Sequence, residues 1–209
     1  MPLTCKSLID KHKQAWEAAT VHPFLNDCKM GTIKPEQFNI WLVQDYLFVT
    51  EFTRMVARLL AVAPVPHFDT VLGGLAALKD ELNWFAEKAQ ERNLDLNTSR
   101  QDTCKRYCQF MENLGLEPYT VQAVAFWAIE LAYNQAWQLP GPMVNAYEEF
   151  VDRWGNPEFT NYVRRLEKQA DEMLAKAREE DCNRTEEVFT ELCGLEKAFW
   201  QMAHEGKAS

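Results

Sequence analysis

Apolar side chains recur along most of the chain at the three- and four-residue spacing of an α-helix, and nowhere alternate as in a β-strand. Prolines and most glycines fall between the apolar stretches, where helices begin and end. The chain has no internal repeat and no low-complexity linker. We therefore predict an all-α fold, a single-domain helical bundle over 1–209. Helices are predicted at 4–19, 35–63, 69–92, 119–138, 144–153, 158–180 and 185–204. A further helix is predicted to be capped by Thr98 or Ser99 and to end near residue 115.

One long predicted helix carries a carboxylate in the middle of its apolar face. Helical spacing places five apolar side chains on one face of this helix: Phe38, Leu42, Val49, Phe52 and Val56. Between Leu42 and Val49 the same face has one more position, and Asp45 occupies it. Burying a carboxylate costs several kcal/mol unless it is hydrogen-bonded or paired. A core selected only for stability would have leucine at this position. Asp45 is therefore a candidate functional residue.

The predicted helix 119–138 contains a single charged side chain, Glu130, with Phe126, Tyr133 and Trp137 on the same face. A helix that is apolar nearly all round is typical of a buried one, so Glu130 is expected to be buried. Perturbed buried carboxylates cluster at functional sites. The alternative is a structural carboxylate that is hydrogen-bonded to a neighbouring helix.

A third inward carboxylate is predicted on the last helix, where Glu196 falls between Leu192 and Phe199. This helix carries other acids, so a solvated rim position is the alternative for Glu196. Carboxylates held close together cannot all ionise cheaply, so one has a raised pKa and donates a proton while another accepts one. The pattern indicates acid–base chemistry, and nearby aromatic side chains suit a flat heteroaromatic ligand.

Composition excludes several partners. The net charge is −9 and basic residues are scattered, which argues against nucleic acid and against a polybasic membrane contact. The N-terminus has no apolar run and no stretch approaches a membrane span, so we expect a cytoplasmic protein with no membrane contact. The six cysteines contain no C-x-x-C pair and are expected to be small core residues in a reducing compartment.

Familiar catalytic machinery is missing from the sequence. None of the three serines lies in a G-x-S-x-G motif, and no histidine follows a glutamate at the Glu-x-x-His spacing of di-iron bundles. No H-E-x-x-H motif and no glycine-rich phosphate loop is present. The sequence therefore implies no metal and no cofactor.

Two signatures resemble those of the TenA (thiaminase II) family. The first runs from His22-Pro23-Phe24 through Gly31-Thr32 and Trp41-Leu42 to Gln44-Asp45-Tyr46, and the second contains Glu196, Phe199-Trp200 and Met202-Ala203. The resemblance spans almost the whole chain. It implies a haem-oxygenase-like helical fold without haem, hydrolysis of aminopyrimidine breakdown products of thiamin during salvage, and a homodimer or homotetramer.

The resemblance also implies roles for individual residues. Asp45 would bind the amino group and a ring nitrogen of the pyrimidine, Glu196 would lie beside the scissile C–N bond, and the ring slot would be lined by Phe48, Tyr107 and Trp154. Members of the family have a nucleophilic cysteine on the helix that matches 119–138, but here no cysteine lies between 108 and 182. The chain is therefore similar to the plant-type subfamily that lacks this cysteine, and Glu130 with Glu196 is the candidate catalytic pair.

The resemblance to the plant-type subfamily implies an N-formylated aminopyrimidine as the preferred substrate, and it leads to a hypothesis of function. We expect amide hydrolysis of N-formyl-4-amino-5-aminomethyl-2-methylpyrimidine, with slower deamination of the product, in which one glutamate activates water and the other protonates the amine. Tyr133 is expected to orient the water or to stabilise the oxyanion. One alternative is a non-catalytic protein that binds a pyrimidine or a partner helix. A third hypothesis is a cofactor-independent oxidase, for which the sequence offers no positive support.

Overall fold

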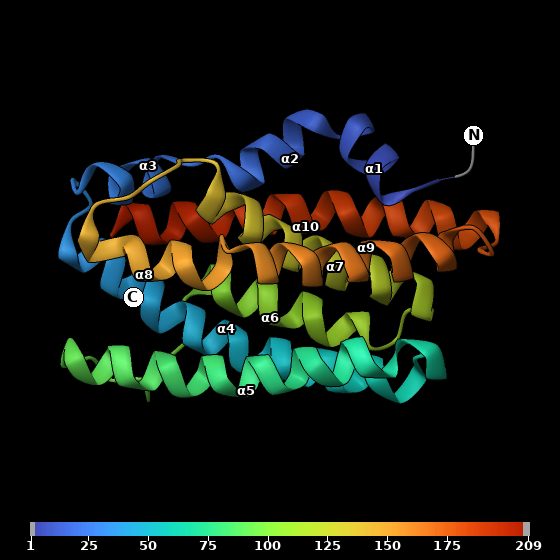
Figure 1. The fold of residues 1–209 in the computed structure, drawn as a ribbon, viewed down its shortest axis with the longest axis horizontal. Coiled ribbons are helices and arrows are strands. Elements are labelled where there is room, and N and C mark those ends of the chain that lie inside the picture. The colour runs from blue at the N-terminus through green and yellow to red at the C-terminus, as the bar shows by residue number, and fades with distance from the viewer. Residues whose placement is uncertain (1–2, 207–209) are drawn as a thin grey trace. The chain divides into compact units, whose positions relative to one another are not determined.

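The computed structural model describes residues 3–206, and no β-strand occurs among them. The all-α prediction is confirmed. The helices shown in Figure 1 are α1 (Cys5–Lys11), α2 (Lys13–Thr20), α3 (Pro23–Met30), α4 (Pro35–Val62), a 3₁₀ turn η1 (Val65–His67), α5 (Phe68–Glu91), α6 (Asp102–Leu114), α7 (Tyr119–Gln138), α8 (Asn145–Trp154), α9 (Pro157–Leu174) and α10 (Glu179–Glu205).

Local sequence sets many of these boundaries. Pro23, Pro35 and Pro157 each occupy a first helical position, where the missing N–H costs no hydrogen bond. Gly31 ends α3 with φ of 67°, a left-handed conformation that glycine adopts without strain. The predicted range 119–138 coincides with α7. The predicted beginnings of the helices at Pro35 and Pro157 therefore agree with the structure to within one residue.

Tertiary contacts set other boundaries, and here the predictions were wrong. The predicted helix 4–19 is two helices, because His12 leaves the helical conformation at φ −110° and ψ 32° while its ring contacts Glu186 of α10. Helix α6 begins at Asp102 rather than after Thr98 or Ser99. The preceding loop is held by the side chain of Gln44, which accepts from the Gln101 N–H and donates to the Ser99 carbonyl. Helix α3 was not predicted.

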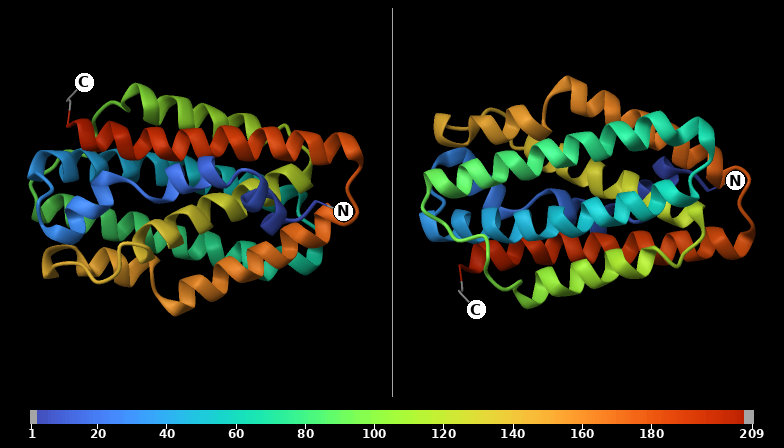
Figure 2. Two further views of the ribbon diagram at one scale, coloured as in Figure 1. Left: turned by 90° about the horizontal axis from the view of Figure 1, so that it is seen from above. Right: turned by 90° about the horizontal axis from the view of Figure 1, so that it is seen from below.

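The helices group into two compact units. Of the described residues, the first unit contains 3–33 and 118–198, and the second contains 34–117 and 199–206. The boundary lies within α10, which Figure 2 shows in red as one uninterrupted helix. The assignment of 1–209 to a single domain remains a prediction. No helix in the described part of the chain is both long and apolar enough to cross a membrane.

In the first unit, α7 is the central helix and packs against α9, α8 and α2. Sixteen of its twenty residues are buried, so the apolar composition of 119–138 has a direct structural cause. The Trp127 ring lies parallel to Trp16 of α2, with 6.4 Å between centroids, and Phe189 of α10 lies 6.3 Å from Trp127. Large aromatic side chains thus join α2, α7 and α10.

In the second unit, α4 packs along α5 and α6 (Figures 1 and 2). The apolar stripe of α4 is buried as predicted, and Asp45 in its centre has no exposed surface. Trp41 contacts Phe38, Phe85 of α5 and Trp200, with ring centroids 5.1–6.4 Å apart. A packed aromatic core therefore encloses the face of α4 that carries Asp45.

Candidate active site

Glu130 is buried in the middle of α7, with 7% of its surface exposed. The Tyr162 hydroxyl of α9 donates to its Oε1, with 3.4 Å between the two oxygens. This hydrogen bond from a neighbouring helix is the contact that a structural carboxylate would make. It is also compatible with a catalytic base, because a neutral donor leaves the carboxylate charge in place.

The residues one and two turns after Glu130 hold the corner between α8 and α9. The Nδ2 of Asn134 donates to the Trp154 carbonyl at 2.7 Å and to the Thr160 hydroxyl at 3.1 Å. The Nε2 of Gln138 donates to the Gly155 carbonyl at 2.9 Å and also reaches Thr160, at 2.8 Å. One face of α7 therefore fixes the beginning of α9 through side-chain hydrogen bonds.

Gly155 is required at this corner for steric reasons. A Cβ at this position would lie 2.8 Å from the Val151 carbonyl oxygen, closer than side-chain carbons approach backbone. The adjacent Asn156 caps α9 by accepting from the Phe159 N–H. The Trp-Gly-Asn sequence thus makes the tight turn that places Trp154 against α7.

An aromatic wall lies beside this corner. Tyr133 meets Trp154 edge to face with centroids 5.8 Å apart, and Trp137 and Phe150 stack on Trp154 at 5.5 and 6.2 Å. Of the predicted site residues, Tyr133 and Trp154 are therefore in contact, and both lie in the unit that contains Glu130. Trp154 is held by its backbone carbonyl as well as by its ring.

Glu196 is also in the first unit, on α10, and is 1% exposed. The alternative of a solvated rim position is excluded by this burial. Burial, together with the nearby charge of Glu196, raises the pKa of the Cys193 thiol to about 12. Glu130 and Glu196 are thus both buried, as the sequence pattern predicted, and both lie in the first unit.

The other predicted site residues lie in the second unit. Phe48 of α4 contacts Tyr107 of α6 with centroids 4.7 Å apart, and both rings contact Phe199. Asp45 is wholly buried one turn before Phe48. The hydrogen bond with Cys108, burial and, to a smaller extent, the charge of Asp45 raise the pKa of Cys104, whose Sγ lies 4.0 Å from that of Cys108.

The comparisons with known proteins identify the family. Residues 9–206 match the TENA/THI-4/PQQC family. A soybean (Glycine max) relative, a probable bifunctional TENA-E protein, is 33% identical over 93% of this chain and 90% of its own. The chain belongs to the TENA/THI-4/PQQC family.

Two further relatives extend the comparison. The X-ray structure of a TenA homologue from Pyrococcus furiosus superimposes with a TM-score of 0.90 and 31% identity, over 95% of this chain and 98% of that one. An aminopyrimidine aminohydrolase from Helicobacter pylori is 21% identical over 95% of this chain and 97% of its own. The helical haem-oxygenase-like fold inferred from the resemblance to TenA is confirmed.

Reasoning from the sequence missed two polar groups of this TenA chain. Tyr162 lies 32 residues from Glu130 on a strongly charged amphipathic helix, so no local pattern connects the two. Glu51 is 3% exposed and forms ion pairs with Arg54 at 3.0 Å and Arg58 at 2.9 Å. The sequence feature that could have indicated these ion pairs is the helical spacing from Glu51 to the arginines three and seven residues later.

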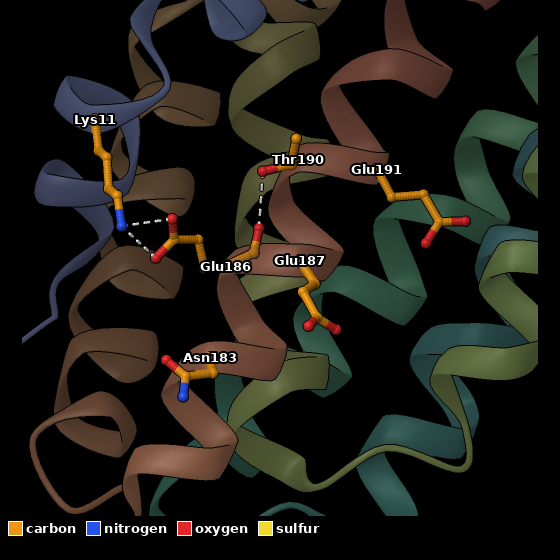
Figure 3. A pocket seen from close by; sticks show the side chains of 6 residues that line it. All are labelled: Lys11, Asn183, Glu186, Glu187, Thr190 and Glu191. Carbon is orange, nitrogen blue, oxygen red and sulfur yellow. Dashed lines mark hydrogen bonds and ion pairs between the residues drawn. The ribbon is translucent and has the colours of Figure 1, made fainter.

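An open hollow on α10 lies apart from these buried side chains. Figure 3 shows its lining, in which Lys11 of α1 reaches Glu186 with an N–O distance of 2.6 Å. The remaining lining residues are polar or acidic side chains of α10: Asn183, Glu187, Thr190 and Glu191. Lacking aromatic groups, this hollow does not suit a flat pyrimidine ring, and we do not assign it to catalysis.

Proposed function

We propose that this protein is a hydrolase of thiamin salvage that cleaves the C–N bond of aminopyrimidines. Its preferred substrate would be N-formyl-4-amino-5-aminomethyl-2-methylpyrimidine, and slower deamination of the aminopyrimidine product to the hydroxymethylpyrimidine would follow. The observation that carries the proposal is a buried glutamate, Glu130, on a central helix that has no cysteine. The aminopyrimidine aminohydrolase and TENA-E relatives support the substrate class.

The absence of a thiol on α7 favours amide hydrolysis over displacement at the ring methylene. A thiolate attacks an electron-poor carbon well, whereas a carboxylate is a poorer nucleophile. A carboxylate is, however, an effective general base toward water. A helix with a buried glutamate and no cysteine therefore fits a reaction in which water, activated by proton removal, attacks a formyl carbon.

In the proposed reaction, Glu130 takes a proton from water while the water oxygen forms a bond to the formyl carbon. The C–N bond then breaks, Glu196 donates a proton to the departing amine, and formate and 4-amino-5-aminomethyl-2-methylpyrimidine are released. The roles of the two glutamates can be exchanged without changing the reactants and products of the hydrolysis. Tyr133 would orient the water or donate to the oxyanion.

For the other predicted site residues, we propose recognition rather than chemistry. Asp45 would accept from the ring amino group and bind a ring nitrogen, and Phe48 and Tyr107 would contact the ring. For Trp154, the proposed role is likewise an aromatic contact with the substrate. The homodimeric or homotetrameric state and the cytoplasmic location remain predictions.

The experiment is a turnover assay with the purified protein. The formylated aminopyrimidine, the free aminopyrimidine and thiamin are offered separately, and products are resolved by chromatography. We expect formate release to be fastest from the first substrate and to be lost in Glu130→Gln. The matched control is Glu51→Gln, which neutralises another buried glutamate and should retain turnover per folded molecule.

Two results would contradict the proposal. Near-wild-type activity of Glu130→Gln would exclude Glu130 as base or acid. Saturable binding of the pyrimidines without turnover of any substrate would instead indicate the alternative, a non-catalytic binding protein in which Asp45 serves recognition only.

A further inference from the structure

The beginning of α9 is held rigidly against α7. Four side-chain hydrogen bonds from Asn134 and Gln138 end on Trp154, Gly155 and Thr160, at 2.7–3.1 Å. Asn134 is 2% exposed, so its amide lies in a low-dielectric environment where losing a partner is costly. The backbone around Thr160 therefore has little freedom to move relative to the face of α7 that carries Glu130.

Tyr162 follows Thr160 by two residues and shares this rigid support. Its ring is half-buried and contacts Phe159 with centroids 5.9 Å apart, while the Arg165 guanidinium lies 5.8 Å from its ring centre. These contacts restrict the ring, and its hydroxyl donates to the Oε1 of Glu130. A neutral hydroxyl on α9, that of Tyr162, therefore donates a hydrogen bond to Glu130, the proposed base on α7.

We infer that Tyr162 is a positioning residue for Glu130, whose hydroxyl fixes the orientation of the carboxylate so that it meets the attacking water. This inference rests on the proposed function. A glutamate side chain rotates about three bonds, and its terminal torsion is broad. A hydrogen bond to one carboxylate oxygen narrows that distribution, and catalysis depends strongly on such alignment.

The test compares kcat and KM for the formylated aminopyrimidine in wild type and Tyr162→Phe. We expect kcat to fall about tenfold, the order of magnitude of one lost hydrogen bond, with KM unchanged. The matched control is Tyr119→Phe. This substitution removes a hydroxyl at the first residue of α7, eleven residues and about 16 Å along the helix from Glu130. It should leave both kcat and KM unchanged.

A double-mutant cycle separates positioning from a general structural effect. If Tyr162 acts through Glu130, Tyr162→Phe should not lower the residual kcat of Glu130→Gln any further. An unchanged kcat in Tyr162→Phe, or an equal fold-loss in both backgrounds, would overturn the inference. An active Glu130→Gln would instead contradict the proposed function, so the two failures are distinguishable.

Discussion

Glu51 and Glu130 are both buried glutamates in long central helices, but their surroundings differ. Glu51 of α4 accepts from Arg54 and Arg58, and a third guanidinium, that of Arg100, lies 3.9 Å away. Glu130 of α7 accepts from the neutral hydroxyl of Tyr162. The first carboxylate is held in an ion-pair network, whereas the hydrogen bond described for the second comes from an uncharged group.

This difference shows why burial alone does not identify a catalytic carboxylate. Ion pairs with several arginine side chains hold a carboxylate in place between them, which suits a structural role. A catalytic base must accept a proton during turnover, so a neutral donor is a better partner for it. We therefore propose a structural role for Glu51 and keep the catalytic role of Glu130 as a proposal, and substitutions can test this separation.

The largest effect is expected from Glu130→Gln. The amide keeps the size of the side chain but cannot take up a proton, so kcat should fall by about 10²–10⁴-fold. Because burying a carboxylate is unfavourable, the free energy of unfolding should equal or exceed that of the wild type. Steady-state kinetics and urea unfolding of the same preparation measure both quantities, and a marked loss of stability would indicate a structural role.

Glu51→Gln should show the opposite pattern. Removing the charge leaves the arginine network incompletely paired, so the free energy of unfolding should fall by about 1–3 kcal/mol. The kcat per folded molecule should stay near the wild-type value. Loss of turnover without loss of stability in this variant would reverse the assignment of the two glutamates.

Arg54→Ala should have a smaller effect on the same network. The Arg54 side chain is 59% exposed, and an exposed ion pair contributes little because water screens it. We expect the free energy of unfolding to change by less than about 1 kcal/mol. Urea unfolding of Arg54→Ala beside Glu51→Gln measures this, and equal losses in the two variants would show that Arg54 is the main partner of Glu51.

The smallest effect concerns the surface pair beside α1. Hydrogen bonds from Lys11 and His12 hold the pKa of Glu186 below its usual range. A lowered pKa in the folded state stabilises the protein above the unfolded-state value of about 4.3, and this contribution is lost as pH falls through the folded pKa. The stability difference between wild type and Glu186→Gln should therefore be present at neutral pH and vanish in acid.

Urea unfolding of wild type and Glu186→Gln at a series of pH values provides the measurement. Lys11→Met is the companion variant, because it removes the first of the two donors and should reduce the same pH-dependent difference. A difference between wild type and Glu186→Gln that persists unchanged below the folded pKa would contradict the ion-pair explanation.

The features predicted from sequence are those that depend on local pattern. Helical spacing placed Asp45 in a buried stripe, and the solitary charge of 119–138 singled out Glu130, which is buried. Pro118 and the Pro140-Gly141-Pro142 turn delimited α7. Periodicity and helix-breaking residues act over a few residues, so the sequence displays them directly.

The features that were missed depend on contacts between distant segments. Arg100 lies 49 residues beyond Glu51, Tyr162 lies 32 residues beyond Glu130, and the break at His12 involves Glu186. Periodicity carries no information on which helices meet or in what register. The roles assigned to the predicted site residues remain predictions for the same reason.

The central claim is that a carboxylate activates water that attacks the formyl carbon. The most direct measurement is a single turnover of the formylated aminopyrimidine in ¹⁸O-labelled water, with enzyme in excess, followed by mass spectrometry of formate and protein. General-base catalysis predicts labelled formate and unlabelled protein. Unlabelled formate, with label on the Glu130 or Glu196 carboxylate, would contradict the account, as would the absence of formate.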